Sequence, residues 1–271
     1  MRWSVNKNDL NISKRTNGIS GFMRVRNEEE WISLAIESHL PFLDEIVVVY
    51  NRCIDTTPEI VEDYAEKYKK VVAYKYEPDV YPQGSSKAIS LPTNSPNSLA
   101  NYYNFALCKT TKKIALKVDG DQIAIPKSYK KMISFVNKNE KKFPFYYRFR
   151  GLNLYYDKNG NVAVQGEKPK TGIDRGFFSI NENTEPWHII DRARGLEILK
   201  FKNIKKKKYS KIGFYHTKGL KKDKGKGNYD LRDNPNSRYH SIFYKEWMDA
   251  KVIPCKKYIH NLPYPSKLGI K

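Results

Sequence analysis

The feature that most constrains the fold is a short, unbroken apolar run, Ile46 to Val49, in a chain of 271 residues. A strand with one face in water alternates apolar and polar side chains, whereas a continuous apolar run is typical of a strand covered on both faces. Such strands occur in sheets that carry helices on both sides. The run therefore predicts an α/β fold.

The segments around this run alternate between strand and helix patterns with short connections. This order predicts βαβ units and a parallel sheet, in which ligands bind at the carboxyl ends of the strands. Arg26, Asn51 and residues 119–121 each follow an expected strand, so we expect them to face one crevice. The expected strands are 19–25, 46–49, 71–76 and 114–118, and the expected helices begin at 28, 58, 99 and 126.

The strand expected at 114–118 ends in two carboxylates that flank a glycine, Asp119-Gly120-Asp121. Residues two apart on an extended chain point the same way, so Asp119 and Asp121 can present two oxygen ligands to one cation. Mg²⁺ or Mn²⁺ would fit, because these ions accept few carboxylates and keep positions open for phosphate oxygens. The alternative is an ordinary Asp-Gly turn at the end of a strand.

The charge of the chain points to an anionic partner. Lys and Arg number 50 against 29 Asp and Glu, which gives a net charge of +21, and two lysine runs lie at 205–208 and 221–226. Nucleic acid, phosphorylated small molecules and an acidic membrane surface are the candidate partners. Since no zinc-finger spacing, RNP-like strand or basic helical stripe is present, specific binding of nucleic acid is disfavoured.

The sequence contains no apolar run of about 18 residues, the length that a membrane-spanning helix needs. The N-terminal residues also lack the apolar core of a signal peptide. We therefore expect a cytoplasmic protein, with the lysine runs able to hold it as a peripheral protein against the inner face of the plasma membrane.

Taken in order, these segments resemble family 2 glycosyltransferases of the GT-A fold, in particular the bacterial enzymes that build lipopolysaccharide, lipooligosaccharide or capsule. The most specific matches are RNEEEWISLAIES at 26–38 and DEIVVV at 44–49, followed by DTTPEI at 55–60 and NFAL at 104–107. The DGD at 119–121 stands at the position of the DXD motif. The resemblance implies transfer of a sugar from a nucleotide-diphosphate donor, UDP-linked by preference, to a lipid-linked or oligosaccharide acceptor with inversion.

The resemblance also implies roles for individual residues. Residues 1–141 would form a Rossmann-like half that binds the nucleotide sugar, and residues 142–271 an acceptor-binding half of the same compact domain. The metal, Mn²⁺ or Mg²⁺, would bind to Asp119, Asp121 and the late histidine His216. Glu197, in the segment GLEIL, is the first candidate for the catalytic base, with Asp174 and Asp191 as competitors. Residues expected to bind the nucleotide sugar are Arg26, Asn27, Asn51, Asp55, Asn104, Asp119 and Lys218.

Two departures from the family pattern stand out, and one other enzyme class remains open. Tyr50 replaces an acidic residue that usually follows the second strand, and Leu196 replaces a histidine expected before Glu197. A sugar-phosphate nucleotidyltransferase would also use a parallel sheet and carboxylate-bound Mg²⁺. Such an enzyme needs a glycine-rich phosphate loop after the first strand, where this chain has Arg24-Val-Arg-Asn-Glu28.

Overall fold

The structure is a computed structural model that describes residues 2–82, 85–139, 144–165, 176–191, 196–201, 204–222 and 252–254. Its strands are β1 (Thr16–Val25), β2 (Glu45–Tyr50), β3 (Val71–Lys75), β4 (Lys112–Lys117), β5 (Gln122–Ala124), β6 (Phe145–Tyr156), β7 (Val162–Gln165), β8 (Gly176–Ser179), β9 (Thr184–Asp191), β10 (Leu196–Phe201), β11 (Lys205–Gly219) and β12 (Val252–Pro254). Its α-helices are α1 (Ile32–His39), α2 (Thr57–Lys67), α3 (Ser86–Ile89), α4 (Leu99–Cys108) and α5 (Pro126–Asn139).

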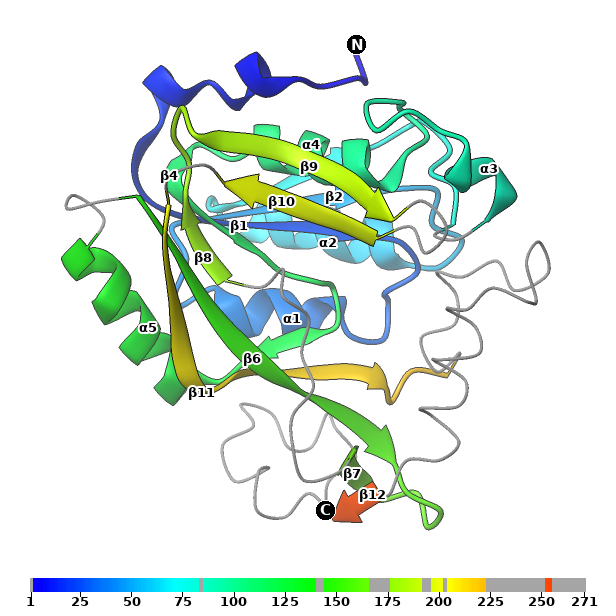
Figure 1. Ribbon diagram of the computed structural model, residues 1–271. Helices are drawn as coiled ribbons and strands as arrows, with labels where there is room; N and C mark the ends of the chain where they lie inside the picture. Colours follow the sequence, from blue (N-terminus) through cyan, green and yellow to red (C-terminus); the bar gives the residue numbers. More distant parts are fainter. Residues whose placement is uncertain are drawn as a thin grey trace.

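The N-terminal half forms the parallel sheet that the sequence predicts. Its strands lie in the order β3-β2-β1-β4, and each neighbouring pair is parallel. In the central strand β2, Val47 and Val49 pack toward α4, while Ile46 and Val48 pack toward α1 and α2. Helices therefore cover both faces (Figure 1), which explains the continuous apolar run and confirms the α/β class.

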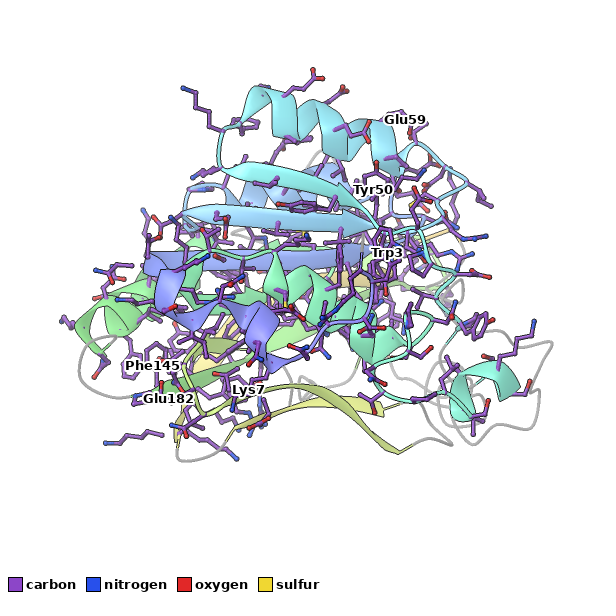
Figure 2. The ribbon with its side chains drawn as sticks, turned by 90° about the horizontal axis from the view of Figure 1, so that it is seen from above. Trp3, Lys7, Tyr50, Glu59, Phe145 and Glu182 are labelled. Carbon is purple, nitrogen blue, oxygen red and sulfur yellow. The ribbon has the colours of Figure 1, made fainter. Side chains whose placement is uncertain are left out.

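The N-terminal segment before β1 packs onto the face of the sheet that α4 covers. The ring of Trp3 meets that of Tyr76 edge-on with centroids 5.1 Å apart, and Lys7 forms an ion pair with Glu185 of β9 at 3.0 Å. Figure 2 shows Trp3 and Lys7 on this segment. The leader thus links the α4 face to the second half of the chain.

The second half extends the same sheet with mostly antiparallel strands. β8 pairs with β4, β6 with β8, and β7 with β6, all antiparallel. The long strand β11 runs parallel to β6 and also pairs antiparallel with the short β5. The hairpin of β9 and β10 forms a separate small sheet beside α4 (Figure 1). Because β11 pairs with β5, it reaches the carboxyl edge of the parallel strands.

The structure corrects the expected start of the first helix at residue 28. The first helix begins at Ile32, so the acidic residues 28–30 form a turn before the helix and not its first turn. Asn27, just before this turn, has a left-handed backbone with φ of 55°, and its Oδ1 accepts a hydrogen bond from the backbone N–H of Ile54. Residues 157–161 form the turn between β6 and β7. Among the described residues, no helix has the length and apolar character needed to cross a bilayer.

Candidate metal and nucleotide site

The turn between β4 and β5 carries the two aspartates at the carboxyl edge of the parallel sheet. The backbone N–H of Gln122 donates to the carbonyl of Asp119 at 3.0 Å and closes the turn. A side chain at Gly120 would meet Cγ1 of Val25 at 2.9 Å and Cγ of Glu28 at 3.0 Å, so glycine allows the close approach. The segment is therefore a tight turn that also brings the carboxylates of Asp119 and Asp121 close together.

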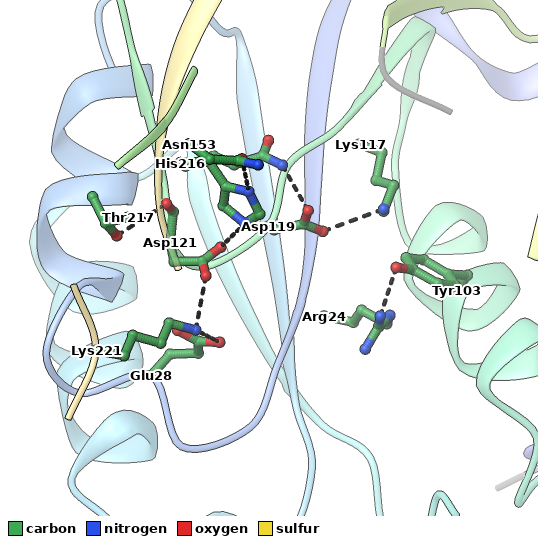
Figure 3. A network of polar contacts seen from close by, with 11 residues as sticks. Arg24, Glu28, Tyr103, Lys117, Asp119, Asp121, Asn153, His216, Thr217 and Lys221 are labelled. Carbon is green, nitrogen blue, oxygen red and sulfur yellow. Dashed lines mark hydrogen bonds and ion pairs between the residues drawn. The ribbon is translucent and has the colours of Figure 1, made fainter. Parts of the chain in front are cut away.

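His216 comes from β11 and completes a three-residue group with the aspartates. The pairing of His216 with Gln122 brings the imidazole to the turn, and the carbonyl of Asp121 accepts from the backbone N–H and the hydroxyl of Thr217 at 2.9 and 3.1 Å. One ligand atom from each of Asp119, Asp121 and His216 lies within 4.8 Å of the others. Figure 3 shows these three residues with their polar contacts.

Asn153 of β6 orients the imidazole. Its side-chain oxygen lies 3.0 Å from Nδ1 of His216 and can only accept, so Nδ1 carries the proton. The opposite nitrogen, Nε2, lies 3.1 Å from Oδ1 of Asp121. This arrangement, in which a second residue fixes the tautomer of a histidine, is typical of histidines that bind metals. Two carboxylates and one imidazole form a donor set that fits Mn²⁺ or Mg²⁺.

Asp119 is held on the side of the turn that faces α4. Its Oδ1 lies 3.3 Å from Nζ of Lys117, and its Oδ2 accepts from the amide of Gln122 at 2.6 Å. Lys117 lies 4.8 Å from the centroid of the Tyr103 ring, and the guanidinium of Arg24 lies 4.0 Å from the same ring. Lys117 therefore contacts both Asp119 and the ring of Tyr103, and Arg24 packs against the same ring (Figure 3).

Lys221 approaches the turn from the opposite side and contacts two carboxylates. Its Nζ lies 2.8 Å from Oδ2 of Asp121 and 2.7 Å from Oε1 of Glu28. Burial alone would raise the pKa of Asp121, but the electrostatic and hydrogen-bonding contacts with His216 and Lys221 hold it well below its usual value. For Lys221, the two carboxylates outweigh burial and raise the pKa. Asp121 and Lys221 are thus a charged pair in a nearly dry environment.

Comparison with known proteins decides the family. The profile of the family described as Beta-1,4-N-acetylgalactosaminyltransferase (CgtA) matches residues 12–256. The chain belongs to this family. The match confirms the predicted glycosyltransferase class and, with the parallel strand order described above, the GT-A fold class. No protein in the curated set matches the chain in sequence.

Some solved structures are distantly similar to this CgtA family member. The S. aureus protein TarS is 15% identical, with a TM-score of 0.46 and coverage of 73% of this chain, which spans 36% of the TarS chain. A shorter form, TarS 1–349, is 13% identical with a TM-score of 0.47, covering 85% of this chain and 72% of that one. Glucosyl-3-phosphoglycerate synthase from Mycobacterium tuberculosis is 18% identical with a TM-score of 0.35, covering 56% and 50%.

Asn51, which the sequence predicts to contact the nucleotide, lies directly after β2. The side chain is buried, and its amide nitrogen donates to the backbone carbonyls of Tyr76 at 2.6 Å and Pro78 at 2.8 Å. Asn51 therefore anchors the segment after β3, and its amide nitrogen is already used for this purpose. Its contact with the nucleotide stays a prediction.

Other predicted nucleotide residues lie around the same edge in different settings. The carboxylate of Asp55 accepts from the backbone N–H groups of Glu29 and Thr57, both at 3.1 Å, so it joins the turn after β1 to the start of α2. Arg26 is half-buried directly after β1. Asn104 is buried on α4, and Lys218 is half-buried on β11 two residues past His216. Their roles in binding stay predictions.

The candidates for the catalytic base lie at the limits of what the structure describes. Glu197 lies on β10 opposite Ile189, and Asp191 is the last residue of β9, opposite Leu196. Only the backbone of these positions is described. Asp174 lies outside the described residues. Which carboxylate removes the proton therefore stays a prediction for all three residues.

Three residues of this site were not singled out from the sequence as site residues: Asn153, Glu28 and Lys117. Lys117 could have been recognised, because a lysine inside an otherwise apolar strand pattern is unusual. Asn153 is likewise a polar residue in the apolar part of a strand. Glu28 gives no such signal, since it is one of three consecutive glutamates.

Proposed function

We propose that this CgtA family member transfers N-acetylgalactosamine from a UDP-linked donor to a saccharide acceptor of a bacterial surface glycan, such as lipooligosaccharide. The observation that carries the proposal is the convergence of Asp119, Asp121 and His216 at the carboxyl edge of the parallel strands, in a chain matched by the family over residues 12–256. Ligands of parallel α/β sheets bind at this edge.

Asp119, Asp121 and His216 would hold one Mn²⁺ or Mg²⁺, which when bound neutralises charge on the departing diphosphate. The support is the donor set itself, together with the Asn153 contact that turns Nε2 of His216 toward Asp121. Lys117 and Gln122 keep Asp119 in place, so its carboxylate does not need to reorganise when the donor binds.

The two halves of the chain would bind different substrates. Residues 1–141 would bind the nucleotide, with Arg26 and Asn104 as candidate contacts, and residues 142–271 would bind the acceptor. Among Glu197, Asp191 and Asp174, one carboxylate would accept the proton of the attacking hydroxyl, which typically contributes roughly 10²- to 10⁴-fold. A β-linked product from an α-linked donor would mean inversion by a single displacement.

A transfer assay tests this proposal. The purified chain is incubated with truncated lipooligosaccharide and each of several UDP-sugars, with Mn²⁺ or with a chelator, and the anomeric configuration of the product is read by NMR. We expect transfer only of N-acetylgalactosamine, only with metal, in the β configuration, and loss of transfer in Asp121→Asn. Asp157→Asn, which changes a half-buried carboxylate in the β6–β7 turn, is the matched control. An α-linked product, or full activity of Asp121→Asn, would contradict the proposal.

We also propose that the basic surface holds the enzyme against an anionic membrane. Lys205, Lys206 and Lys208 are exposed at the start of β11, and basic residues near an anionic leaflet contribute about 1 kcal/mol each. Lys221 does not belong to this surface, because it is buried in the site. We expect co-sedimentation with vesicles that contain phosphatidylglycerol and none with neutral vesicles. Equal binding to both kinds of vesicle would rule out the electrostatic attachment.

A further inference from the structure

The side chain of Lys221 is largely buried between two carboxylates at the edge of the site. It is only 9% exposed, and its ammonium group contacts Asp121 at 2.8 Å and Glu28 at 2.7 Å. The neighbouring backbone supports this position, since Leu220 is buried and the N–H of Lys222 donates to Glu30 at 3.2 Å. Lys221 is therefore packed against the turn after β1, and its position is fixed by buried contacts on both sides.

The two oxygens of Asp121 face two different partners. Oδ1 faces Nε2 of His216, on the side where the three candidate metal ligands converge, and Oδ2 faces Lys221. A positive charge one carboxylate away from a metal position repels a divalent cation, and the repulsion is strong because the surroundings are buried. The same charge attracts an anion such as a diphosphate.

We propose that Lys221 is a resident cation of this site, which holds Asp121 when no metal is bound, weakens the binding of a divalent ion alone and strengthens the binding of the nucleotide diphosphate. This inference rests on the proposed function, because it assumes that Asp121 is a metal ligand. It implies that a divalent ion binds well only when the nucleotide diphosphate is also present.

The test is to replace Lys221 by methionine, which keeps the length of the side chain and removes its charge. Binding of Mn²⁺ alone is followed by the electron paramagnetic resonance signal of the free ion, and binding of UDP without metal is followed by calorimetry. In Lys221→Met we expect Mn²⁺ to bind about tenfold more tightly or better, and UDP alone to bind about tenfold more weakly. A change that only disturbs the fold would weaken both.

Two further variants keep the test decisive. Lys222→Met removes an exposed charge from the next residue and should change neither affinity by more than about twofold. Lys221→Met leaves Glu28 buried without its partner, so the double variant Glu28→Gln/Lys221→Met serves if the single variant does not fold. In the double variant we expect the same opposite shifts, because the charge that is removed next to Asp121 is the same.

The outcomes separate this inference from the function on which it rests. Tighter Mn²⁺ and weaker UDP binding in the Lys221 variants would support it. Unchanged or weaker Mn²⁺ binding in both variants, with wild-type protein that binds Mn²⁺ and UDP together, would overturn the role of Lys221 and leave the proposed function standing. Wild-type protein that binds no Mn²⁺ even with UDP would overturn both.

Discussion

At the scale of single residues, the contact between Asn153 and His216 sets the geometry of the candidate metal site. The Asn153 oxygen lies 3.0 Å from Nδ1 of His216, on the side of the ring opposite Asp121. Without this acceptor the imidazole could rotate or place its proton on Nε2, and Nε2 would no longer be a ligand. Loss of the Asn153 contact should therefore weaken metal binding by more than the free energy of one hydrogen bond.

We predict that Asn153→Ala weakens the binding of Mn²⁺ in the presence of UDP by roughly 10- to 100-fold, the usual cost of losing a partner of a metal-binding histidine. The affinity is measured by calorimetric titration of Mn²⁺ into protein saturated with UDP. Asn153→Asp keeps an acceptor for Nδ1–H and should retain most of the affinity. An alanine variant that binds Mn²⁺ like the wild type would show that Asn153 does not position His216.

A second residue, His39 at the end of α1, makes stability depend on pH. It is completely buried, Nδ1 donates to the carbonyl of Ala35 at 2.7 Å, and Nε2 accepts from the hydroxyl of Tyr129 at 2.8 Å. Burial lowers the pKa of His39 from 6.5 to about 4. The unfolded chain therefore takes up a proton at a higher pH than the folded chain does.

We predict that the His39 contribution to stability is fully present above pH 6.5 and is lost as the pH falls toward 4, by about 2 to 3 kcal/mol in total. Urea unfolding at pH 7.5 and at pH 4.5 measures this loss. His39→Gln cannot take up the proton, so the difference in stability between the wild type and the variant should shrink at pH 4.5. A difference that is the same at both pH values would contradict the prediction.

At the scale of elements, β11 connects the second half of the chain to the site. It runs beside β6, where Gly151 lies opposite Phe214, and it carries His216 two residues further on. A Cβ at position 151 would lie 2.2 Å from Cε2 of Phe214, whose ring is buried and packs edge-on against Phe149. The glycine therefore permits the close contact of the two strands.

We predict that Gly151→Ala lowers the free energy of unfolding by roughly 1 to 3 kcal/mol, the usual cost of overpacking, and weakens Mn²⁺ binding because β11 must shift. Urea unfolding gives the first value and calorimetric titration the second. The double variant Gly151→Ala/Phe214→Leu removes the clash and should recover part of the loss. Equal losses in the single and double variants would show that the contact with Phe214 is not the cause.

The elements of the parallel sheet could be predicted from the sequence because their signals are local. The apolar run of β2, the alternation in β4 and the turn at Gly120 each lie within a few residues. The predicted start of α1 at residue 28 was wrong. The acidic residues 28–30 suit a first helical turn when they are considered alone, but in the structure Glu28 lies before the helix and forms an ion pair with Lys221. That contact joins residues 193 positions apart.

At the scale of the whole molecule, the candidate site depends on both halves of the chain. Asp119 and Asp121 follow β4, whereas Asn153, His216 and Lys221 come from the second half. The aspartates could be predicted from their spacing, and His216 from the resemblance to glycosyltransferases. Asn153 could not be placed in the site, because the pairing of β11 with β5 and β6 brings it next to His216 and no short motif encodes that pairing.

The central claim is that Asp121 helps to bind a metal together with a nucleotide diphosphate. The most direct test is thermal unfolding with UDP, with and without Mn²⁺, for the wild type, Asp121→Ala and the control Asp157→Ala in the β6–β7 turn. At about a hundred times its Kd a ligand adds about 2.7 kcal/mol, which should raise the Tm by about 5 °C or more. We predict this rise for the wild type and the control when both Mn²⁺ and UDP are present, and its loss in Asp121→Ala. An equal rise in all three proteins, or none in the wild type, would contradict the account.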